Sequence, residues 1–355
     1  MDSRKSLNIK YMASQIFYFG AFAAMMGYAS VYLLYKGFSN STIGIILSLC
    51  SILAVFMQPA LASFADNHKN IEIRKIINTI VAIAIILSVA LLVIPTNQTL
   101  IFILIVAIFS LETTIMPLIN TLAFIFEKYG IQINFGIARG LGSVAYALTS
   151  MALGYIVEWF SPDLLPICYV VFNALLFIVV HLFVLPKNAQ IVNADEESET
   201  EAEVQENVSL LKFASKYKKF IVFLLGFVLV YFAHTIINNF FIQIVTNVGG
   251  NSSDMGNAVF LAAMLELPTM AYFTKLSQKV NCGTLIKASI VLFLAKHAIT
   301  YLATNMVMIY IAQVLQMGAY ALFIPASVYY VNCKVDNKDI VKGQSFVTTS
   351  MTMSG

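Results

Sequence analysis

Residues 74–94 read RKIINTIVAIAIILSVALLVI, an apolar run that opens on two basic residues and contains no acidic one. An α-helix needs about twenty apolar residues to cross the ~30 Å hydrocarbon core of a bilayer. Runs of this kind recur along the 355 residues, of which 59% are hydrophobic and 11% are charged. The sequence therefore predicts an all-α polytopic membrane protein whose solvent is the lipid bilayer.

Ten complete spans are expected from the apolar runs. They cover residues 11–35, 42–65, 74–94, 99–126, 136–159, 164–185, 220–246, 255–275, 284–303 and 306–331. An eleventh span begins near Val341, but only 13 residues follow Lys342, so the fold is expected to be truncated within helix 11. The run after Lys10 has full transmembrane length and lacks a small-residue cleavage pattern, so no cleavable signal peptide is expected.

The basic residues predict the orientation of the chain. Every one of the 21 Lys and Arg residues except Lys36, Arg139 and Lys296 lies before the first span or near the cytoplasmic end of an even-numbered one. The positive-inside rule then places the N-terminus in the cytoplasm, and we expect a multi-pass protein of the plasma membrane. The net charge of +3 is accounted for by this bias, so no nucleic-acid partner is expected.

A charged segment is expected to divide the chain in two. Seven acidic residues between Asp195 and Glu206 precede four lysines that end at Lys219, and such a composition cannot form a packed core. The sequence therefore predicts three parts. They are an N-terminal six-helix half (residues 1–186), a cytoplasmic linker (187–219) and an incomplete C-terminal half (220–355).

Two external turns resemble each other. Residues 37–44 read GFSNSTIG and residues 249–256 read GGNSSDMG, and each turn opens a span that contains a proline. Parallel repeats of six helices are one recurrent architecture of secondary transporters. The alternative is that two turns rich in glycine, serine and asparagine are alike by chance.

Four ionisable side chains are expected inside spans: Glu112, Arg139, Glu266 and Lys296. A charge in the middle of the membrane costs at least ~2.5 kcal/mol and usually faces a cavity or a partner. We predict that these four line a central cavity, two from each half. The alternatives are structural salt bridges between helices and, for Arg139, an anchor that reaches the lipid headgroups. The aromatic residues at 17–19 and 22 are instead expected to face lipid or the membrane interface, and the alternative is that one of them lines the cavity.

Neutral and aromatic side chains extend this set. His234 and His297 can carry protons near neutral pH, or can be hydrogen-bonded packing residues. At least one of Asn238 and Asn239 is expected to face the interior, because an amide is costly in lipid. Asn238 and Lys296 are expected to contribute to binding of the solute. Tyr146 lies two helical turns after Arg139 on nearly the same face, so its ring can stack on a sugar while the guanidinium donates to hydroxyls. Packing in the core explains this tyrosine equally well.

One loop carries a family resemblance. Residues 62–69, ASFADNHK, followed by Arg74 and Lys75, resemble the loop 2–3 motif of the major facilitator superfamily, Gly-x-x-x-Asp-Arg with basic residues nearby. Ala62 replaces the glycine here. The resemblance implies a gating motif of Asp66, Arg74 and Lys75, in which the carboxylate pairs with loop cations or a helix N-terminus and is released as the two halves rock. A solvated interfacial Asp66 is the alternative.

A narrower resemblance lies in two spans. Residues 134–148, NFGIARGLGSVAYAL, and 263–268, AMLELP, are similar to the oligosaccharide–proton symporter (lactose permease-like) family of that superfamily. The resemblance covers nearly the whole chain and implies the major facilitator fold of two six-helix halves. It also implies sugar transport coupled to protons.

The same resemblance implies roles for single residues. Arg139 would bind sugar hydroxyls and Tyr146 would stack on the sugar ring. Glu266 corresponds to a glutamate of the family, and Lys296 lies where the family has an arginine. Asn120 stands at the place of a carboxylate that pairs with the arginine in the family.

The departures from this family limit what it implies. Residues 315–319, LQMGA, stand where the family has a histidine and its proton-carrying glutamate. Proton coupling through that pair is therefore not expected. Glu266 and Glu112 remain as candidate proton carriers, with His234 and His297 as further candidates.

We therefore expect a permease: a secondary active transporter, and a monomer, that imports a small polar, sugar-like solute by alternating access in symport with a proton. A drug or metabolite efflux antiporter of the same fold and an inactive truncated remnant are the alternatives. An enzyme acting on lipid substrates would need clustered acids or a nucleophile with a base, which the sequence does not offer. The cysteines have no CxxC or histidine pairing, so no metal and no cofactor is expected.

Overall fold

The computed structural model describes residues 3–68, 71–93, 97–129, 131, 133–184 and 215–336, together with residues 343, 346, 347, 350 and 351. The elements in this part of the chain are helices, which confirms the predicted all-α class. The chain divides into two compact units. Unit 1 is Met1–Tyr28, Lys36–Tyr146 and Asp163–Val208, and unit 2 is Ala29–Tyr35, Ala147–Pro162 and Ser209–Gly355. Most of the predicted linker, 187–219, and most of the expected eleventh span lie outside the described residues; the last residues of the linker, from 215, are described, and its final two already belong to α10.

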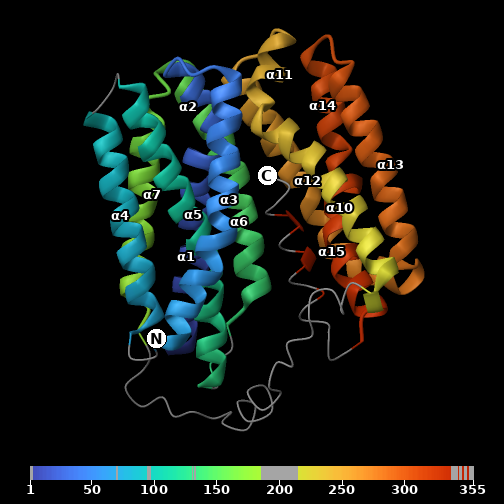
Figure 1. Ribbon diagram of the computed structural model, residues 1–355, viewed down its shortest axis with the longest axis horizontal. Coiled ribbons are helices and arrows are strands. Elements are labelled where there is room, and N and C mark those ends of the chain that lie inside the picture. Colours follow the sequence, from blue (N-terminus) through green and yellow to red (C-terminus); the bar gives the residue numbers. More distant parts are fainter. Residues whose placement is uncertain are drawn as a thin grey trace. The chain divides into compact units, whose positions relative to one another are not determined.

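Unit 1 is a bundle of long helices (Figure 1). It contains α1 (Ser3–Phe22), the π-helix η1 (Ala23–Gly27), α3 (Asn40–Asn67), α4 (Ile73–Val93), α5 (Gln98–Lys128), the first part of α6 (Phe135–Trp159) and α7 (Leu164–His181). α4 packs against α5 and α7, and α1 packs against α7. The buried core between these helices includes Tyr18, Ile77, Val81, Ile119 and Leu176. Apolar faces at helical spacing thus supply the packing that holds the unit together.

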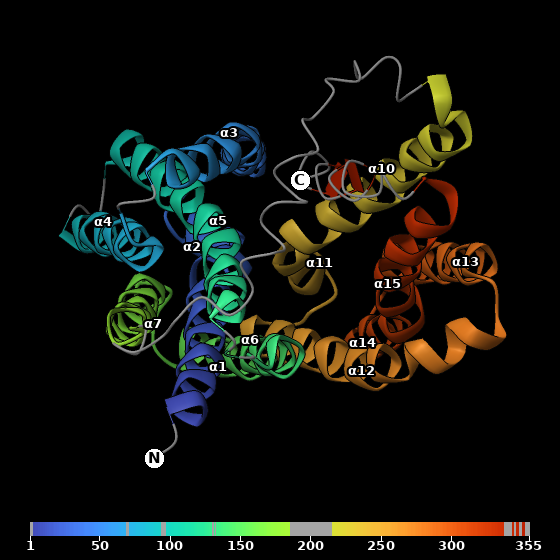
Figure 2. The same ribbon diagram turned by 90° about the horizontal axis from the view of Figure 1, so that it is seen from below.

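Unit 2 contains the helices of the second half of the sequence. They are α10 (Lys218–Asn239), α11 (Phe241–Asn247), α12 (Ser252–Lys279), α13 (Cys282–Tyr301), α14 (Met306–Val314) and α15 (Gln316–Lys334). α15 packs against α12 and α13, which lie beside it in Figure 2. In its core Phe227 stacks on Phe323, and Phe293 meets Phe323 edge to face.

Two short segments of the first half also belong to unit 2. One is α2 (Ala29–Tyr35), in which the Ser30 hydroxyl donates a hydrogen bond to the carbonyl oxygen of Asn239. The other is the end of α6, where Glu158 accepts a 3.3 Å hydrogen bond from the backbone N–H of Ser252. The chain therefore passes from unit 1 to unit 2 between η1 and α2, and again in the middle of α6.

The predicted spans correspond to helices, although several are broken. Eight helices of the described residues are long and apolar enough to cross a membrane, and a ninth is obtained if η1 and α2, bent by 42°, continue α1 as one span. The predicted span 255–275 lies in α12, which is too polar to be among them. The predicted span 220–246 is interrupted at Phe240, and the span 306–331 at Leu315.

The two similar external turns have the same local geometry. Gly37 and Gly249 adopt φ angles of +81° and +83°, which glycine reaches without the clash of a Cβ atom. Two residues later, Ser39 caps α3 and Asn251 caps α12 by accepting a backbone N–H. The likeness seen in the sequence therefore extends to the way each helix begins.

Candidate functional site

In unit 1 the predicted binding residue Arg139 is half-buried on α6 and contacts an aromatic ring of α1. Its guanidinium carbon lies 4.3 Å from the ring centroid of Phe19, and its Nη1 donates a 3.3 Å hydrogen bond to the Ser143 hydroxyl. The ring of Phe19 reaches this position because α6 has a glycine beneath it. A Cβ at Gly142 would lie 2.5 Å from the Phe19 ring. The arginine is therefore held by neighbouring side chains inside the unit.

Tyr146 lies further along the same helix. Its ring centroid is 6.2 Å from that of Phe22, and its hydroxyl would lie 3.1 Å from a Cβ at Gly27. Phe19, Phe22 and the buried Tyr18 form one aromatic cluster with it. The expectation that the aromatic residues of this segment face lipid is therefore wrong for Tyr18, because the side chain packs in the core.

Asn120 is joined to a residue that the sequence did not single out. The side-chain amide of Gln15 on α1 donates to Asn120 over 3.4 Å and to the Tyr11 hydroxyl over 3.1 Å. Gln15 is fully buried, and its Oε1 has no hydrogen-bond partner among the described residues. Gln15 could have been predicted from the sequence, because an amide inside an apolar span is costly in lipid and tends to face neighbouring helices.

Glu112 is buried in the same unit, on α5. The Tyr169 hydroxyl on α7 donates a 2.7 Å hydrogen bond to its Oε2. Among the described residues, Glu112 has no ion pair with a cation. The alternative of a salt bridge between Glu112 and Arg139 therefore finds no support in this arrangement.

In unit 2, three side chains from three helices form a continuous polar chain. Lys296 of α13, only 1% exposed, donates from its Nζ to Oε1 of Gln316 on α15. The amide of Gln316 in turn donates a 2.8 Å hydrogen bond to Oε1 of Glu266 on α12. A neutral amide thus links the predicted base to the predicted acid. Gln316 was not predicted because it stands where the resembled family has ionisable residues. An uncharged amide at that position indicated only that those ionisable residues are absent.

The predicted histidines lie together in unit 2. The rings of His234 on α10 and His297 on α13 are nearly parallel, with centroids 6.1 Å apart. The Asn238 amide donates a 3.0 Å hydrogen bond to Nε2 of His234. Nδ1 of His234 and Nε2 of His297 are buried without a partner in the described part of the chain. Since His297 follows Lys296 directly, this pair adjoins the polar chain.

The basic part of the predicted gating motif pairs with a residue that was not predicted. Arg74 and Lys75 both contact Glu72, the latter over 3.4 Å, and Arg74 also donates a 3.0 Å hydrogen bond to the carbonyl oxygen of His181 at the end of α7. The hydrogen bond from Arg74 lowers the pKa of Glu72 below its ordinary value. Asp66 lies in the last turns of α3, and its side chain lies outside the described part of the structure.

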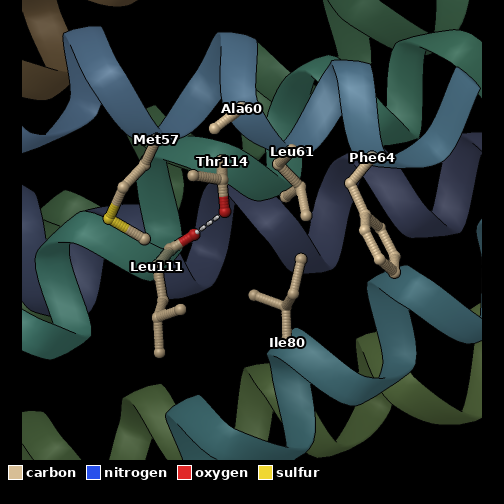
Figure 3. Close-up of a pocket in the computed structure, with 7 residues that line it drawn as sticks. All are labelled: Met57, Ala60, Leu61, Phe64, Ile80, Leu111 and Thr114. Atoms are coloured by element: carbon tan, nitrogen blue, oxygen red, sulfur yellow. Dashed lines mark hydrogen bonds between the residues drawn. The ribbon is translucent and has the colours of Figure 1, made fainter. Parts of the chain in front are cut away.

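A groove of ≈ 300 Å³ in unit 1 is a poor candidate for a polar solute. Figure 3 shows its lining, which is apolar except for Thr114, whose hydroxyl is already used to donate to the carbonyl oxygen of Leu111. Solute sites need a few well-placed polar groups to fix orientation. We therefore place the candidate site at Arg139 and at the polar chain rather than in this groove. The described residues contain no group of three or more His, Cys, Asp or Glu side chains arranged to hold a metal ion.

Comparisons with known proteins agree on one architecture. The model of the MFS_1 like family matches residues 8–355. A curated protein of Bacillus subtilis (strain 168), the uncharacterized transporter YwbF, is 27% identical over 330 residues, which are 90% of this chain and 77% of that protein.

Solved structures are similar over almost the whole chain. The nucleoside transporter NupG has a TM-score of 0.78 at 17% identity, covering 100% of this chain and 88% of its own. The D-xylose-proton symporter has a TM-score of 0.68 at 10% identity, covering 98% and 87%. The peptide transporter POT in complex with sulfate has a TM-score of 0.70 at 10% identity, covering 99% and 86%. At these identities the likeness establishes the fold alone.

Proposed function

Because this chain belongs to the MFS_1 like family, whose fold is that of secondary transporters, we propose that it imports a small polar, sugar-like solute by alternating access, coupled to a proton. The predicted major facilitator fold is confirmed, and it is the fold of a transporter rather than of an enzyme. The narrower resemblance to oligosaccharide–proton symporters, and with it the sugar and the proton, remains part of the proposal.

The polar chain Lys296–Gln316–Glu266 carries this proposal. An ionisable group inside a membrane segment costs roughly 2.5–3.5 kcal/mol on insertion scales, and such groups mark solute or proton pathways. Here a buried ammonium and a carboxyl group are joined through one amide. Protonation of Glu266 removes its negative charge and weakens the bond from Gln316, because hydrogen bonds to charged groups are the stronger ones. The three helices α12, α13 and α15 would then be free to shift.

His234 and His297 are proposed as the neighbours through which the proton passes. Their stacked rings adjoin Lys296, and each has a ring nitrogen without a partner in the described structure. A histidine nitrogen can both accept and donate a proton near neutral pH. Asn238 would hold the His234 ring in one orientation.

Arg139, Tyr146 and Asn120 are proposed to contact the solute. A guanidinium offers a planar fork of donors suited to hydroxyl pairs, and a tyrosine ring offers an apolar face. Phe19 supports the guanidinium at 4.3 Å, so its donors are preorganised. The names of the similar structures mention a nucleoside and D-xylose, both of which carry hydroxyl groups.

The proposal includes the placement of the chain. The bias of Lys and Arg places the N-terminus and the loop of Arg74 and Lys75 in the cytoplasm of a cell whose plasma membrane holds the protein. Release of the Arg74 and Lys75 contacts, with Asp66, would accompany the rocking of the two halves. The protein is proposed to act as a monomer that needs only the lipid bilayer, its solute and a proton.

The decisive experiment is solute-dependent proton uptake into vesicles that contain the protein. A panel of sugars, oligosaccharides and nucleosides is offered to the wild type, to Glu266→Gln and to Glu72→Gln as a matched control at the surface. We expect one solute class to drive alkalinisation outside the vesicles, lost in Glu266→Gln. Glu72→Gln should retain solute-dependent proton uptake, although its rate can change because Glu72 contacts Arg74 and Lys75 of the gating motif. A well-folded protein that moves no proton with any solute would refute the coupling and favour uniport, efflux or an inactive protein.

A further inference from the structure

The carboxyl group of Glu112 is the most completely buried acid in the described residues. It is 0% exposed on α5, in unit 1, and is therefore part of a different unit from the polar chain. Its Oε2 accepts the 2.7 Å hydrogen bond from Tyr169. Its Oε1 is buried and has no partner among the described residues. One of the two carboxyl oxygens therefore lacks a hydrogen bond in the described structure.

The surroundings of Glu112 supply no positive charge from the part of the chain that the structure describes. Tyr169 faces it from α7, and Tyr18 from α1 donates a 3.4 Å hydrogen bond to its backbone carbonyl oxygen. Tyr169 and Tyr18 are the titratable side chains of the described residues that contact Glu112. α3 and α4 also pack against α5 and contribute no ion pair or hydrogen bond to the carboxyl group in the described residues.

A second unsatisfied acceptor lies beside Tyr169. Asn173 is one helical turn further along α7 and is 0% exposed. Its amide donates a 3.2 Å hydrogen bond to the backbone carbonyl oxygen of Tyr169, but its Oδ1 is buried without a partner in the described structure. Tyr169 thus has two buried oxygens next to it, one on Glu112 and one on Asn173, that both lack a donor there. A buried acceptor without a donor is unfavourable, and a proton on one of two such oxygens would turn it into a donor.

We propose that Glu112, Tyr169 and Asn173 form a proton-binding site, in which Glu112 carries a proton on Oε1 in this conformation. Tyr169 fixes Oε2 as an acceptor and so directs the proton to the other oxygen. We assign the Oδ1 of Asn173, one turn further along α7 from Tyr169, as the acceptor of this O–H group. A carboxylate in the same place would be a buried charge without a counter-ion, which the protein interior does not tolerate.

This site differs from the proton pathway proposed above in its position and its chemistry. It contains no base, it lies in the other unit, and its partners are two neutral side chains of one helix. Loss of the proton would leave a negative charge between α5 and α7, so the two helices would have to separate or admit water. The use of this proton in transport depends on the proposed function, but its presence on Glu112 does not.

Infrared difference spectroscopy tests the proton directly. The spectrum of the wild type minus that of Glu112→Gln, taken at neutral pH on purified protein, is expected to contain the carbonyl band of a protonated carboxylic acid. Glutamine has the shape of the neutral acid, so this variant is expected to fold. Tyr169→Phe is expected to shift the band to higher frequency, because the carbonyl oxygen loses a donor. Glu158→Gln, at a hydrogen-bonded site near the end of α6, serves as the control and should leave the band unchanged.

Three results would overturn the proposal. One is a difference spectrum with carboxylate bands and no acid band at neutral pH. Another is an acid band that Tyr169→Phe does not move. The third is an acid band that sodium ions abolish at constant pH, since a metal cation would then be the ligand of this site. None of these results depends on transport, so a failure here is distinct from a failure of the solute-driven proton uptake.

Discussion

Gln316 donates a 2.8 Å hydrogen bond from its side-chain amide to Oε1 of Glu266, which joins the first residue of α15 to the middle of α12. The same amide group accepts from Lys296 through its oxygen. Both polar ends of one neutral side chain are thus used, the donor end on an acid and the acceptor end on a base. Replacement of Gln316 by an apolar residue therefore removes both hydrogen bonds at once.

Replacement of Gln316 by leucine is expected to destabilise the protein. The buried Lys296 loses its acceptor, which costs about 1–3 kcal/mol. Unfolding in detergent by denaturant measures the change. Gln58→Leu is the matched control, because Gln58 loses only a 3.0 Å hydrogen bond to the backbone of Thr113. Equal stability of the two variants would show that the bridge contributes little.

The charges of Lys296 and Glu266 are expected to be energetically coupled. In a double-mutant cycle, Lys296→Met and Glu266→Gln should be non-additive in the free energy of unfolding by ~0.5–3 kcal/mol, since both belong to one hydrogen-bonded network. Lys287→Met is the control from the exposed start of the same helix and should combine additively with Glu266→Gln. Additivity in both cycles would show that Lys296 and Glu266 are not energetically coupled through Gln316.

Exchange of Arg139 for lysine is expected to weaken solute binding while the fold remains. Lysine keeps the charge but loses the planar fork and its stacking on Phe19. We expect KM for the transported solute to rise about tenfold, equivalent to ~1.4 kcal/mol, with an unchanged melting temperature. Tyr146→Phe should retain most uptake and Tyr146→Ala should lose it. An unchanged KM in Arg139→Lys would remove this residue from the solute site.

Two neighbouring glycines of α6 are expected to respond differently to alanine. At Gly142 a Cβ would lie 2.5 Å from the ring of Phe19, so Gly142→Ala displaces the ring from Arg139 and costs ~1–3 kcal/mol. At Gly140 no atom lies within 4 Å of the added Cβ. Gly140→Ala should therefore be neutral, or stabilising by ~0.5–1 kcal/mol through helix propensity. The reverse order of stabilities would contradict the close contact of the Phe19 ring with Gly142.

Glu72 is expected to make stability depend on acid pH. Its pKa is lowered in the folded state, first by the hydrogen bond from Arg74. Its contribution is thus present above the ordinary glutamate pKa of ~4.3 and is lost as the pH falls through the lower folded value. The side chain is 50% exposed, so the difference between wild type and Glu72→Gln should be at most ~1 kcal/mol and should shrink in high salt. A difference that is independent of pH would argue against this ion pair.

The sequence predicted the helices well and their interruptions poorly. The length of an apolar run is enough to predict a span, because a helix that crosses the bilayer must be apolar over about twenty residues. The interruptions at Ala23–Gly27, Phe240 and Leu315 have no proline or glycine pair that would announce them. They are set by the packing of neighbouring helices, which one segment of sequence does not encode.

The candidate site was predicted unevenly for a similar reason. Glu112, Glu266 and Lys296 were found because a charge inside an apolar run is conspicuous. Gln316 and Tyr169 were missed because amides and tyrosines occur in many spans, and their role depends on which side chain lies opposite. The partners of a buried charge are thus a property of the tertiary structure.

The π-helix η1 affects how the chain tolerates a change of length. A π-helical turn closes its hydrogen bonds one residue later than an α-helical turn, so the segment Ala23–Gly27 holds a residue that a regular helix would not. Each residue of an α-helix turns the chain by about 100°. Deletion of one residue from the regular part of α1 would rotate α2 by that angle and carry Ser30 away from the carbonyl oxygen of Asn239. Deletion of the extra residue within η1 would instead let the segment close as a regular helix while α2 keeps its register, so a loss of one residue in the course of evolution is tolerated best at this point.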